Sequence, residues 1–368
     1  MNCKTVLLKD LVLGEKGSYG IGAPAVDYDP KKYTYLRITD INDDGSINTN
    51  GLKSVDAEDA YKYILQENDI VFARTGASTG KTYFYQPQDG TLVYAGFLIK
   101  FSIDPQKVNP RLLKYITHSQ EYYNWVHSFD TGGTRGNINA VTFANMPITL
   151  PDRATQDKIV AILSSLDDKI ELNRRINANL EQQAQALYKS WFVDADTTGW
   201  GTKKLADFFN VITGKKDANY STKDGVYPFF TCSQDILKAP NYSFEGAAIL
   251  LAGNGDFNVK RYIGKFEAYQ RTYVLIPFEK RYHSFLYLLI KYHLQEITGG
   301  SRGSVIKFIT KGNIADFTFT MPPYSIDEKL SLFDSLFNEI DKNITEINNL
   351  STIRDTLLPK LMSGEITV

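Results

Sequence analysis

A long stretch without glycine or proline, from Arg153 to Phe192, most constrains what this chain can fold into. Along it, mostly apolar residues recur in alternating steps of four and three, the heptad spacing of a helix that packs along one seam. Such a helix rises about 1.5 Å per residue and would be on the order of 50–60 Å long. The pattern predicts a helix over 152–193 with this seam: Ile159, Leu163, Leu166, Ile170, Asn173, Asn177, Leu180, Ala184, Leu187 and Trp191.

A second heptad pattern near the other end of the chain predicts a second long helix, over 323–362. Either each helix packs on its own domain, or the two helices pack on each other as a coiled coil that holds two globular halves. Globular helices usually end well short of this length, so we expect the coiled coil, with Asn173 and Asn177 setting its register. The second seam is predicted at Ile326, Leu330, Phe333, Phe337, Ile340, Ile344, Ile347, Ser351, Arg354, Leu358 and Leu361.

The segments before the two heptad patterns repeat each other, which indicates an internal duplication. T-G-G-T-R-G-N-I at 131–138 matches T-G-G-S-R-G-S-V at 298–305, and each octapeptide lies shortly before a long helix. The elements expected around the octapeptides also correspond: strands 69–74 and 92–101 with 247–252 and 269–276, and helix 110–125 with helix 284–295. We therefore expect an α+β fold with two duplicated globular domains and pseudo-two-fold symmetry, joined by the coiled coil.

The predicted boundaries follow from the same patterns. Between the first helix and the second domain, D-A-D-T-T-G-W-G is rich in small and turn-forming residues, which is typical of a linker. The expected segments are a first domain at 1–151, a first spacer helix at 152–193, a linker at 194–201, a second domain at 202–322, a second spacer helix at 323–362 and a tail at 363–368.

The charge is unevenly distributed along the 368 residues, although the net charge is only −1. Residues 200–320 contain 16 Lys and Arg against 10 Asp and Glu, whereas residues 1–151 contain 15 against 16. Residues 321–368 contain 4 against 8, so the second domain is basic and its helix is acidic. A basic domain suits a phosphate backbone, and an excess of six positive charges is a modest signal for one.

Cysteine usage and hydropathy indicate a cytoplasmic protein. Cys3 and Cys232 are the two cysteines, and two distant cysteines make no disulfide framework. Residues 1–17 have only short apolar runs with charged residues between them, so we expect neither a signal peptide nor a membrane helix there. No other run approaches the ~20 apolar residues that cross a bilayer, and no membrane association is expected.

Two stretches approach catalytic motifs, and neither is complete. Arg74 to Thr82 resembles a phosphate-binding loop, but Thr75 stands where the motif has its first glycine, and an aromatic strand follows instead of a helix. M-P-P-Y at 321–324 resembles the N-P-P-Y motif of adenine methyltransferases, but Met321 cannot accept a hydrogen bond from a target amino group as asparagine does. The four histidines and two cysteines lack metal-ligand spacing. We expect no catalytic site, no metal and no cofactor.

The duplicated octapeptide is the strongest candidate for a binding site. Its glycines allow the backbone to approach a ligand closely. Arg135 and Arg302 could each form a bidentate pair with guanine or clamp a phosphate. The alternative to a binding site is a glycine-rich turn with an exposed arginine. The duplication makes this alternative less favourable, because both halves have the same donors just before a long helix.

Three further stretches carry a resemblance to a known family: Y-L-R-I-T-D-I-N-D-D-G at 35–45, residues 150–170, and L-L-P-K-L-M-S-G-E-I at 357–366. Together with the duplication, the chain resembles a specificity subunit of a type I restriction–modification system over nearly its whole length. In that family, two target recognition domains each read one half of a split DNA sequence, and two helical regions form an antiparallel coiled coil that spaces them. The chain departs from the family at 151–156, P-D-R-A-T-Q, where a second Pro and a Glu-Gln pair are common, and at I-D-E-K, 326–329.

The resemblance implies partners and a geometry. Such a subunit is not catalytic; it binds double-stranded DNA and positions two methyltransferase subunits and, in the full complex, two motor–nuclease restriction subunits. The outer faces of the coiled coil would dock the methyltransferase. A separation of about 50 Å corresponds to about 15 base pairs, so the half-sites are expected roughly one helical turn or slightly more apart.

Candidate DNA contacts are the polar and basic residues near the glycine-rich segments. Tyr19, Tyr83 and Tyr262 are equally well explained as DNA contacts or as core. The rival hypothesis is a coiled-coil scaffold that binds only protein. The candidates are Arg74, Thr75, Ser78, Lys81, Thr134, Arg135 and Asn137 in the first domain, and Asn254, Lys260, Arg261, Arg271, Ser301, Arg302, Ser304 and Lys307 in the second.

Overall fold

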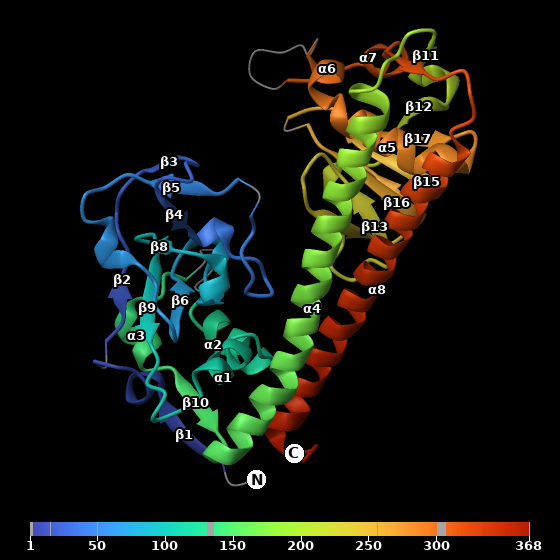
Figure 1. Cartoon of the computed structure of the whole chain (residues 1–368). Coiled ribbons are helices and arrows are strands. Elements are labelled where there is room, and N and C mark those ends of the chain that lie inside the picture. Colours follow the sequence, from blue (N-terminus) through green and yellow to red (C-terminus); the bar gives the residue numbers. More distant parts are fainter. Residues whose placement is uncertain are drawn as a thin grey trace. The chain divides into compact units, whose positions relative to one another are not determined.

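The computed structural model describes residues 3–14, 16–49, 51–130, 136–255, 257–299 and 307–367. It comprises two compact units, one formed by residues 1–170 with 348–368 and the other by residues 171–347. We call these unit 1 and unit 2. Two long helices, α4 (Arg153–Tyr188) and α8 (Asp327–Ser363), each contribute one segment to unit 1 and one to unit 2 (Figure 1). Each unit is described by itself.

Unit 1 contains an α+β domain whose first and last strands pair with each other. Strand β1 (Lys4–Leu7) is antiparallel to β10 (Pro147–Leu150), which closes the domain immediately before α4. The remaining strands form two four-stranded sheets, in the order β2-β9-β6-β7 and β3-β5-β4-β8. Their bounds are β2 Ser18–Tyr19, β3 Ala25–Asp27, β4 Tyr33–Leu36, β5 Lys53–Val55, β6 Asp69–Ala73, β7 Thr82–Phe84, β8 Leu92–Tyr94 and β9 Leu98–Ser102.

The helices of this domain are short, and polar side chains begin each of them. Asn109, Ser119 and Asn139 accept hydrogen bonds from the first turns of α1, α2 and α3, as N-cap residues do. The α-helices are α1 Pro110–Ile116, α2 Gln120–His127 and α3 Ala140–Ala144, and the 3-10 helices are Leu8–Leu11, Ile38–Asp40, Ala60–Tyr63, Gly76–Ser78 and Pro87–Asp89.

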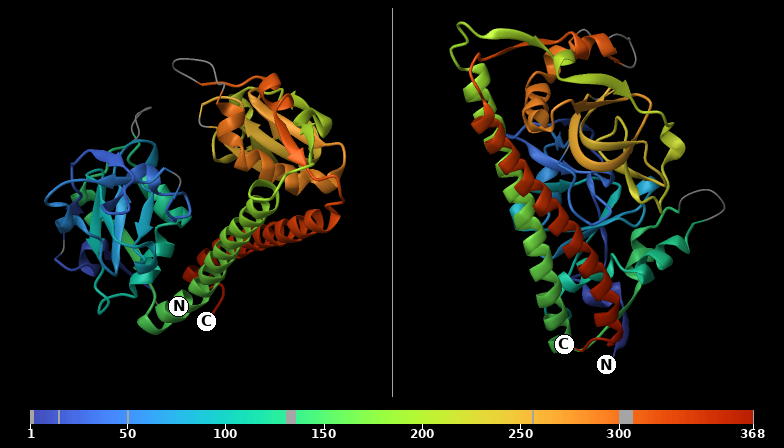
Figure 2. Two further views of the ribbon diagram at one scale, coloured as in Figure 1. Left: turned by 45° about the horizontal axis from the view of Figure 1, so that its top comes forward. Right: turned by 90° about the vertical axis from the view of Figure 1, so that its right-hand side faces the viewer.

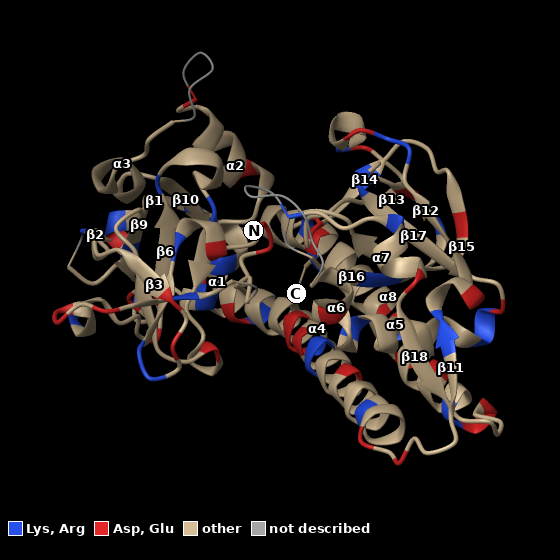
Figure 3. Cartoon of the chain, turned by 90° about the horizontal axis from the view of Figure 1, so that it is seen from above, with Lys and Arg blue, Asp and Glu red and all other residues tan. Residues whose placement is uncertain are grey.

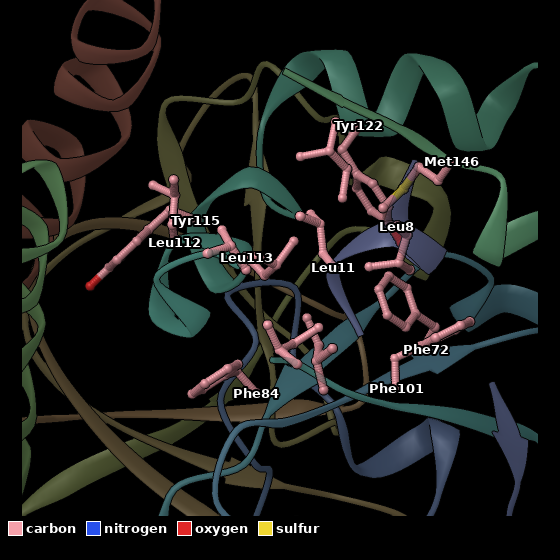
Figure 4. Close-up of a cluster of buried hydrophobic side chains, with 14 of the residues drawn as sticks. Leu8, Leu11, Phe72, Phe84, Phe101, Leu112, Leu113, Tyr115, Tyr122 and Met146 are labelled. Atoms are coloured by element: carbon pink, nitrogen blue, oxygen red, sulfur yellow. The ribbon is translucent and has the colours of Figure 1, made fainter. Parts of the chain in front are cut away.

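A cluster of large apolar side chains fixes the central strand β6 (Figure 4). Phe72 is fully buried and meets Phe101 edge-on, with ring centroids 5.6 Å apart, and Phe143 at 4.8 Å. Tyr122 from α2 joins the same cluster and donates a hydrogen bond from its hydroxyl to the carbonyl oxygen of Gly80, at 2.6 Å. The end of β6 and the loop after it are therefore held by the core on both sides.

Two elements expected to be continuous in this domain are each divided. The expected strand 92–101 is two strands, because β8 and β9 belong to different sheets. The expected helix 110–125 breaks after Ile116. Thr117 is buried there and donates to the carbonyl oxygen of Leu113 at 2.9 Å, while its hydroxyl also lies 2.8 Å from that of Thr82. A side chain that bonds the backbone in this way competes with helix continuation, and Ser119 then caps a new helix.

Unit 2 repeats the closing pair and replaces the two small sheets with one large sheet. Strand β11 (Gly201–Lys204) is antiparallel to β18 (Thr318–Met321), as β1 is to β10. The six-stranded sheet, in the order β12-β17-β15-β16-β13-β14, is strongly curved (Figure 2). Its strands are β12 Phe209–Thr213, β13 Tyr227–Phe230, β14 Ile236–Ala239, β15 Phe244–Ala252, β16 Val259–Ala268 and β17 Thr272–Pro277.

One nearly fully buried helix covers this sheet. Helix α5 packs on β15 and β16, and all its residues from His283 to Ile290 are buried. His283 at its first turn donates from Nε2 to the carbonyl oxygen of Ala248 at 3.0 Å. Burial lowers the pKa of His283 from its ordinary value of 6.5 to about 4, so the ring is neutral in the fold. The helices are α5 His283–Tyr292, α6 Leu294–Thr298 and α7 Lys311–Ala315, with 3-10 helices at Leu205–Asp207, Ala218–Tyr220 and Lys280–Tyr282 and a π-helical turn at Lys189–Val193.

Within unit 2, the second half of α4 runs antiparallel to the first half of α8. Apolar residues from both helices share one buried cluster with the domain, among them Ala184, Tyr188, Phe333 and Phe337. Farther along, the contact becomes polar. Asn173 donates to Glu346 at 2.8 Å, and Asn343 donates to the side-chain oxygen of Asn177 at 2.8 Å.

One predicted seam residue is wrong in register. Ile344 is 47% exposed, whereas Asn343 is only 8% exposed. Asn343 lies in the seam because its side-chain amide donates a hydrogen bond to that of Asn177, so this polar group is paired although it is buried. The neighbouring Ile344 therefore points outward. Most other predicted seam residues are buried: Ile159, Leu163, Ile170, Ala184, Ile326, Leu330, Phe333, Phe337, Ile340, Leu358 and Leu361.

Within unit 1, a buried carboxylate joins the domain to both long helices. Asp167 on α4 accepts from Lys114 at 2.6 Å and from the hydroxyl of Tyr115 at 3.0 Å, both on α1. Arg354 on α8 donates to its other oxygen at 2.9 Å. Burial alone would raise the pKa of Asp167, but the two cations hold it below its ordinary value. Unit 2 has a counterpart, where Glu181 accepts from Tyr287 and Lys291 of α5.

Removing Arg354 tests the Asp167 cluster. We expect Arg354→Met to destabilise unit 1 by about 3 kcal/mol, because a largely buried carboxylate loses one of its two cations. Arg153→Met is the matched control: its pair with Asp157 is about half exposed, so the loss should stay under about 0.5 kcal/mol. The measurement is urea unfolding of both variants. Equal decreases in the free energy of unfolding would show that the Asp167 cluster stabilises the fold no more than an exposed ion pair does.

The buried His283 predicts a pH dependence of stability. Its pKa is lower in the folded chain, so the unfolded chain binds more protons between pH 6.5 and about 4. The free energy of unfolding should therefore decrease as the pH is lowered from 6.5 to about 4, by at most about 3 kcal/mol. His283→Gln, whose amide can still donate to Ala248, should lack this component. Melting temperatures of the wild type and of His283→Gln at pH 7.5 and 5.0 check this. If the melting temperature decreases by the same amount in both proteins, the prediction is contradicted.

Candidate DNA interface

In unit 1, the end of strand β6 is joined to two other segments by backbone hydrogen bonds. The amide of Arg74 donates to the carbonyl oxygen of Phe97 at 3.1 Å, just before β9. The amide of Ile138 donates to the carbonyl oxygen of Arg74 at 3.0 Å. Arg74 thus lies between the start of β9 and the segment that follows the first octapeptide loop. We call residues 74–75, 97 and 137–138 the strand-end edge of unit 1.

The side chain of Arg74 is supported at this edge. Its guanidinium lies over the ring of Tyr19, with 5.1 Å from Cζ to the ring centroid. Its Nε donates to Oδ1 of Asn137 at 3.3 Å. Tyr19 is itself held, because its hydroxyl accepts from the amide of Ala140 at 3.1 Å. Three of the sequence candidates, Arg74, Thr75 and Asn137, therefore come together at one edge.

The loop after β6 turns directly into strand β7. Gly76 and Gly80 have φ of +71° and +87°, a conformation that favours glycine. A Cβ on Gly80 would lie 2.6 Å from Val126, so this glycine also lets the loop pack on α2. Because Lys81 is followed by a strand and not by a helix, no helix N-terminus faces the loop, and the phosphate-binding resemblance ends there.

Two candidates on this loop are occupied by contacts within the chain. Ser78 is 8% exposed. Lys81 forms an ion pair with Asp43 at 2.8 Å and also donates to the carbonyl oxygen of Ile41 at 3.3 Å. The lysine therefore fastens the loop to the segment after β4. Its charge is already partly compensated, which weakens the case for it as a DNA contact.

The first octapeptide loop is clamped at its base. The amide of Gly136 donates to Oδ1 of Asp130 at 3.0 Å, and the hydroxyl of Thr79 donates to the carbonyl oxygen of Gly136 at 3.2 Å. Gly136 is therefore tied both to Asp130 and to the loop after β6. Thr134 and Arg135 lie outside the described residues, as do Ser301, Arg302 and Ser304 of the second octapeptide.

Unit 2 builds the same edge from different residues. The amide of Gly253 donates to the carbonyl oxygen of Arg271 at 2.8 Å, and the amide of Ile309 donates to that of Gly253 at 3.0 Å. Gly253 thus occupies the position that Arg74 holds in unit 1. Asn254 lies opposite Phe308 in a β-bridge, so Asn254, Arg271 and Lys307 gather at this edge.

Two basic candidates in unit 2 are committed to the fold. Arg261 forms a bidentate pair with Asp341 of α8, at 2.8 and 3.0 Å, and stacks on Phe337. Its side chain is only 9% exposed, which argues against the predicted DNA contact of Arg261. The alternation of β16 directs it toward α8. Lys260 donates to the carbonyl oxygen of Ser233 and to Asn258, and burial lowers its pKa.

The aromatic candidates divide between core and surface. Tyr83 is 1% exposed, and Tyr262 packs against Phe230 and Phe266, so both belong to cores. Tyr19 is 42% exposed at the strand-end edge. Sequence reasoning missed Phe97 and Phe308, which are 59% and 40% exposed at the two edges. The signal was available in part, since an aromatic directly after Gly96 in an otherwise apolar strand marks a break.

The described residues show neither a metal-binding cluster nor a membrane-spanning helix. Among them, no group of three or more His, Cys, Asp or Glu is arranged to hold a metal ion. No helix within the described ranges combines the length and apolar character needed to cross a membrane.

Comparisons with known proteins agree with the duplication. The model of the type I restriction modification DNA specificity domain matches residues 2–182 and again residues 197–350. The EcoDI specificity subunit of Escherichia coli is 39% identical over 176 residues, which cover 46% of this chain and 39% of that protein. The MjaIX specificity subunit of Methanocaldococcus jannaschii is 25% identical over 303 residues, 70% of this chain and 69% of that protein.

A solved structure shares the fold. The S subunit of a type I restriction–modification system from M. genitalium aligns with a TM-score of 0.55 and 16% identity over 98% of this chain and 96% of that one. The matched region spans less than half the length of the E. coli relative. The two matches of the family model each include one of the two domains described above, and together they cover most of the residues. The chain therefore belongs to the family of type I restriction–modification DNA specificity domains.

Proposed function

We propose that this chain is the DNA-recognition subunit of a type I restriction–modification complex and reads a bipartite target. It carries no catalytic residues of its own and positions methyltransferase subunits on the DNA. The observation that carries the proposal is the double match of one DNA specificity model to two domains that build the same strand-end edge. The different side chains at these edges, Arg74 in one domain and Gly253 in the other, suit two different half-sites.

Recognition by each domain would combine two kinds of contact. Lys and Arg neutralise phosphates and give affinity without sequence preference. Side chains that reach base edges in the major groove supply the preference. Arg74, Thr75 and Asn137 in the first domain, and Asn254, Arg271 and Lys307 in the second, are the described residues that gather where both contacts can form. The octapeptide residues Thr134, Arg135, Ser301, Arg302 and Ser304 stay candidates from sequence.

The two long helices would act as a ruler between the half-sites. Helix α4 has 36 residues and α8 has 37, which corresponds to about 55 Å each. We propose that they form one antiparallel coiled coil with pseudo-two-fold symmetry, because each unit buries apolar residues of both helices. The amides of Asn173, Asn177 and Asn343 would then set the register, as buried polar residues do in coiled coils.

The assembly implied by the family includes two methyltransferase subunits and, in the full complex, two motor–nuclease subunits. Outward apolar residues on α4 offer a docking stripe: Ile162, Leu172 and Ile176 are 37%, 51% and 37% exposed and lie on nearly one face of the helix. Charges of both signs are interspersed along the rest of α4 (Figure 3). We place the complex in the cytoplasm, where its DNA substrate is.

The rival is a scaffold that binds only protein. The excess of positive charge in residues 200–320 and the arginine in both octapeptides favour DNA binding. A gel shift of a genomic DNA fragment with chain and methyltransferase together separates the two. A salt-sensitive shift that needs this chain supports DNA recognition, and no shift at any salt concentration supports the scaffold.

Paired substitutions in the octapeptides test the bipartite reading. We expect Arg135→Ala and Arg302→Ala each to relax methylation at one half-site, and at opposite half-sites, by about 1–3 kcal/mol if each arginine reads a base. Each variant serves as the control for the other. The measurement is the methylation rate on targets that carry single-base changes in one half-site. Unchanged preferences in both variants would remove the octapeptides from base recognition.

Shortening the helices in register tests the ruler. Removing residues 168–174 from α4 together with 346–352 from α8 takes one heptad from each and spares the domain contacts of Asp167, Glu181, Asp341 and Arg354. Seven residues span about 10 Å, so the preferred gap should shorten by about three base pairs. Methylation of targets with graded gaps measures this. Removing one segment alone should abolish methylation, because the two helices would no longer match in length. An unchanged preferred gap in the double deletion would contradict the proposal that helix length sets the gap.

A further inference from the structure

The geometry points to Arg74 as the residue that reads a guanine in the half-site of the first domain, with Tyr19 and Asn137 as positioning residues. This inference rests on the proposed function and assigns one base class to one side chain.

The guanidinium of Arg74 is oriented by two neighbours. It stacks over the ring of Tyr19 at 5.1 Å, and Asn137 accepts from its Nε at 3.3 Å. Strand pairing of β2 with β9 fixes Tyr19, and the amide of Ala140 donates to its hydroxyl. Little conformational entropy is left to lose when such a side chain binds, which favours a specific contact over a mobile surface charge.

The terminal donors of Arg74 remain available for a ligand. Within the described part of the chain, no carboxylate pairs with Arg74, and Nη1 and Nη2 have no acceptor. Other basic side chains of this domain are already engaged: Arg37 with Asp40, and Lys81 with Asp43. With Nε bound to Asn137, the two terminal amino groups remain as a pair of donors.

Two parallel donors of this geometry match guanine. Guanine offers the O6 and N7 acceptors side by side in the major groove, and a bidentate arginine is the commonest specific contact to it. A phosphate also accepts two hydrogen bonds, and the experiment below separates these two ligands. Thr75 and the exposed ring of Phe97 flank Arg74, so a base edge there would meet both polar and apolar surface.

At the position of Arg74, the second domain has a glycine. Its backbone hydrogen bonds place Gly253 at the position of Arg74, and Phe308 at that of Asn137. A guanine contact through this position is therefore possible in one domain only. Any effect of Arg74 on sequence preference must appear in one half-site and leave the other unchanged.

The test uses the full chain assembled with its methyltransferase and duplex targets in which one half-site at a time is randomised. Methylated products are sequenced for the wild type, Arg74→Lys, Arg74→Ala and Tyr19→Leu. Arg74→Lys keeps the charge and loses the bidentate fork. We expect it to lower the preference for guanine at one position of one half-site about tenfold or more. Arg74→Ala should show the same loss and slower methylation overall.

Tyr19→Leu should reduce the preference at that same position, and combining it with Arg74→Lys should add no further loss there. Tyr19→Phe, which keeps the ring, should retain most of the preference. These position-specific readouts would not change if Tyr19 only stabilised the fold.

Three results would overturn the inference. Arg74→Lys with unchanged preferences, while Arg74→Ala slows all targets evenly, would make Arg74 a phosphate contact. Unchanged behaviour of both variants would remove Arg74 from the interface. Loss of preference in both half-sites would contradict the asymmetry between the domains. If the wild type itself shows no preference in either half-site, the proposed function fails, which is a separate outcome.

Discussion

Burial of an apolar seam on each long helix is the constraint on which the rest of this structure depends. Neither α4 nor α8 is apolar enough to be a core helix by itself, and each helix contributes its seam to two different cores. In unit 1 the seam adds Ile159 and Leu163 to the domain core, together with Leu358 from α8. In unit 2 it adds Ala184 and Tyr188 together with Phe333. Each domain is therefore completed by helices that also serve the other domain.

Two partly buried carboxylates, Asp167 and Glu181, give this packing its direction. Apolar surfaces can slide over one another, whereas a desolvated carboxylate must keep its partners. Asp167 binds a lysine and a tyrosine of α1, and Glu181 binds a tyrosine and a lysine of α5. The two units thus use the same pair of donors to attach a domain helix to α4. Such attachments suit a protein whose function depends on where each domain sits along a helix.

The sequence was most informative where structure is local or repeated. The heptad spacing identified α4 and α8 because it is a short-range periodicity. The matching octapeptides indicated the duplication because they repeat almost the same residues in both halves. Long-range pairing was not accessible. Thr117 breaks a helix by meeting Thr82, a residue far away in sequence, and Asn343 displaces Ile344 from the seam because Asn177 faces it. Candidate contacts divided in the same way. Arg74 directly follows strand β6 and Arg261 lies within strand β16. Only the fold shows that Asp341 of α8 already pairs with Arg261.

The central claim is that two domains with unlike edges read two short sequences across an unread gap. Mapping modified adenines in a host that carries this chain and its methyltransferase as the sole source of adenine methylation tests it most directly. We expect one motif with two defined segments of different sequence, separated by a fixed number of unspecified base pairs. A single contiguous motif, or two segments whose separation varies freely, would contradict it.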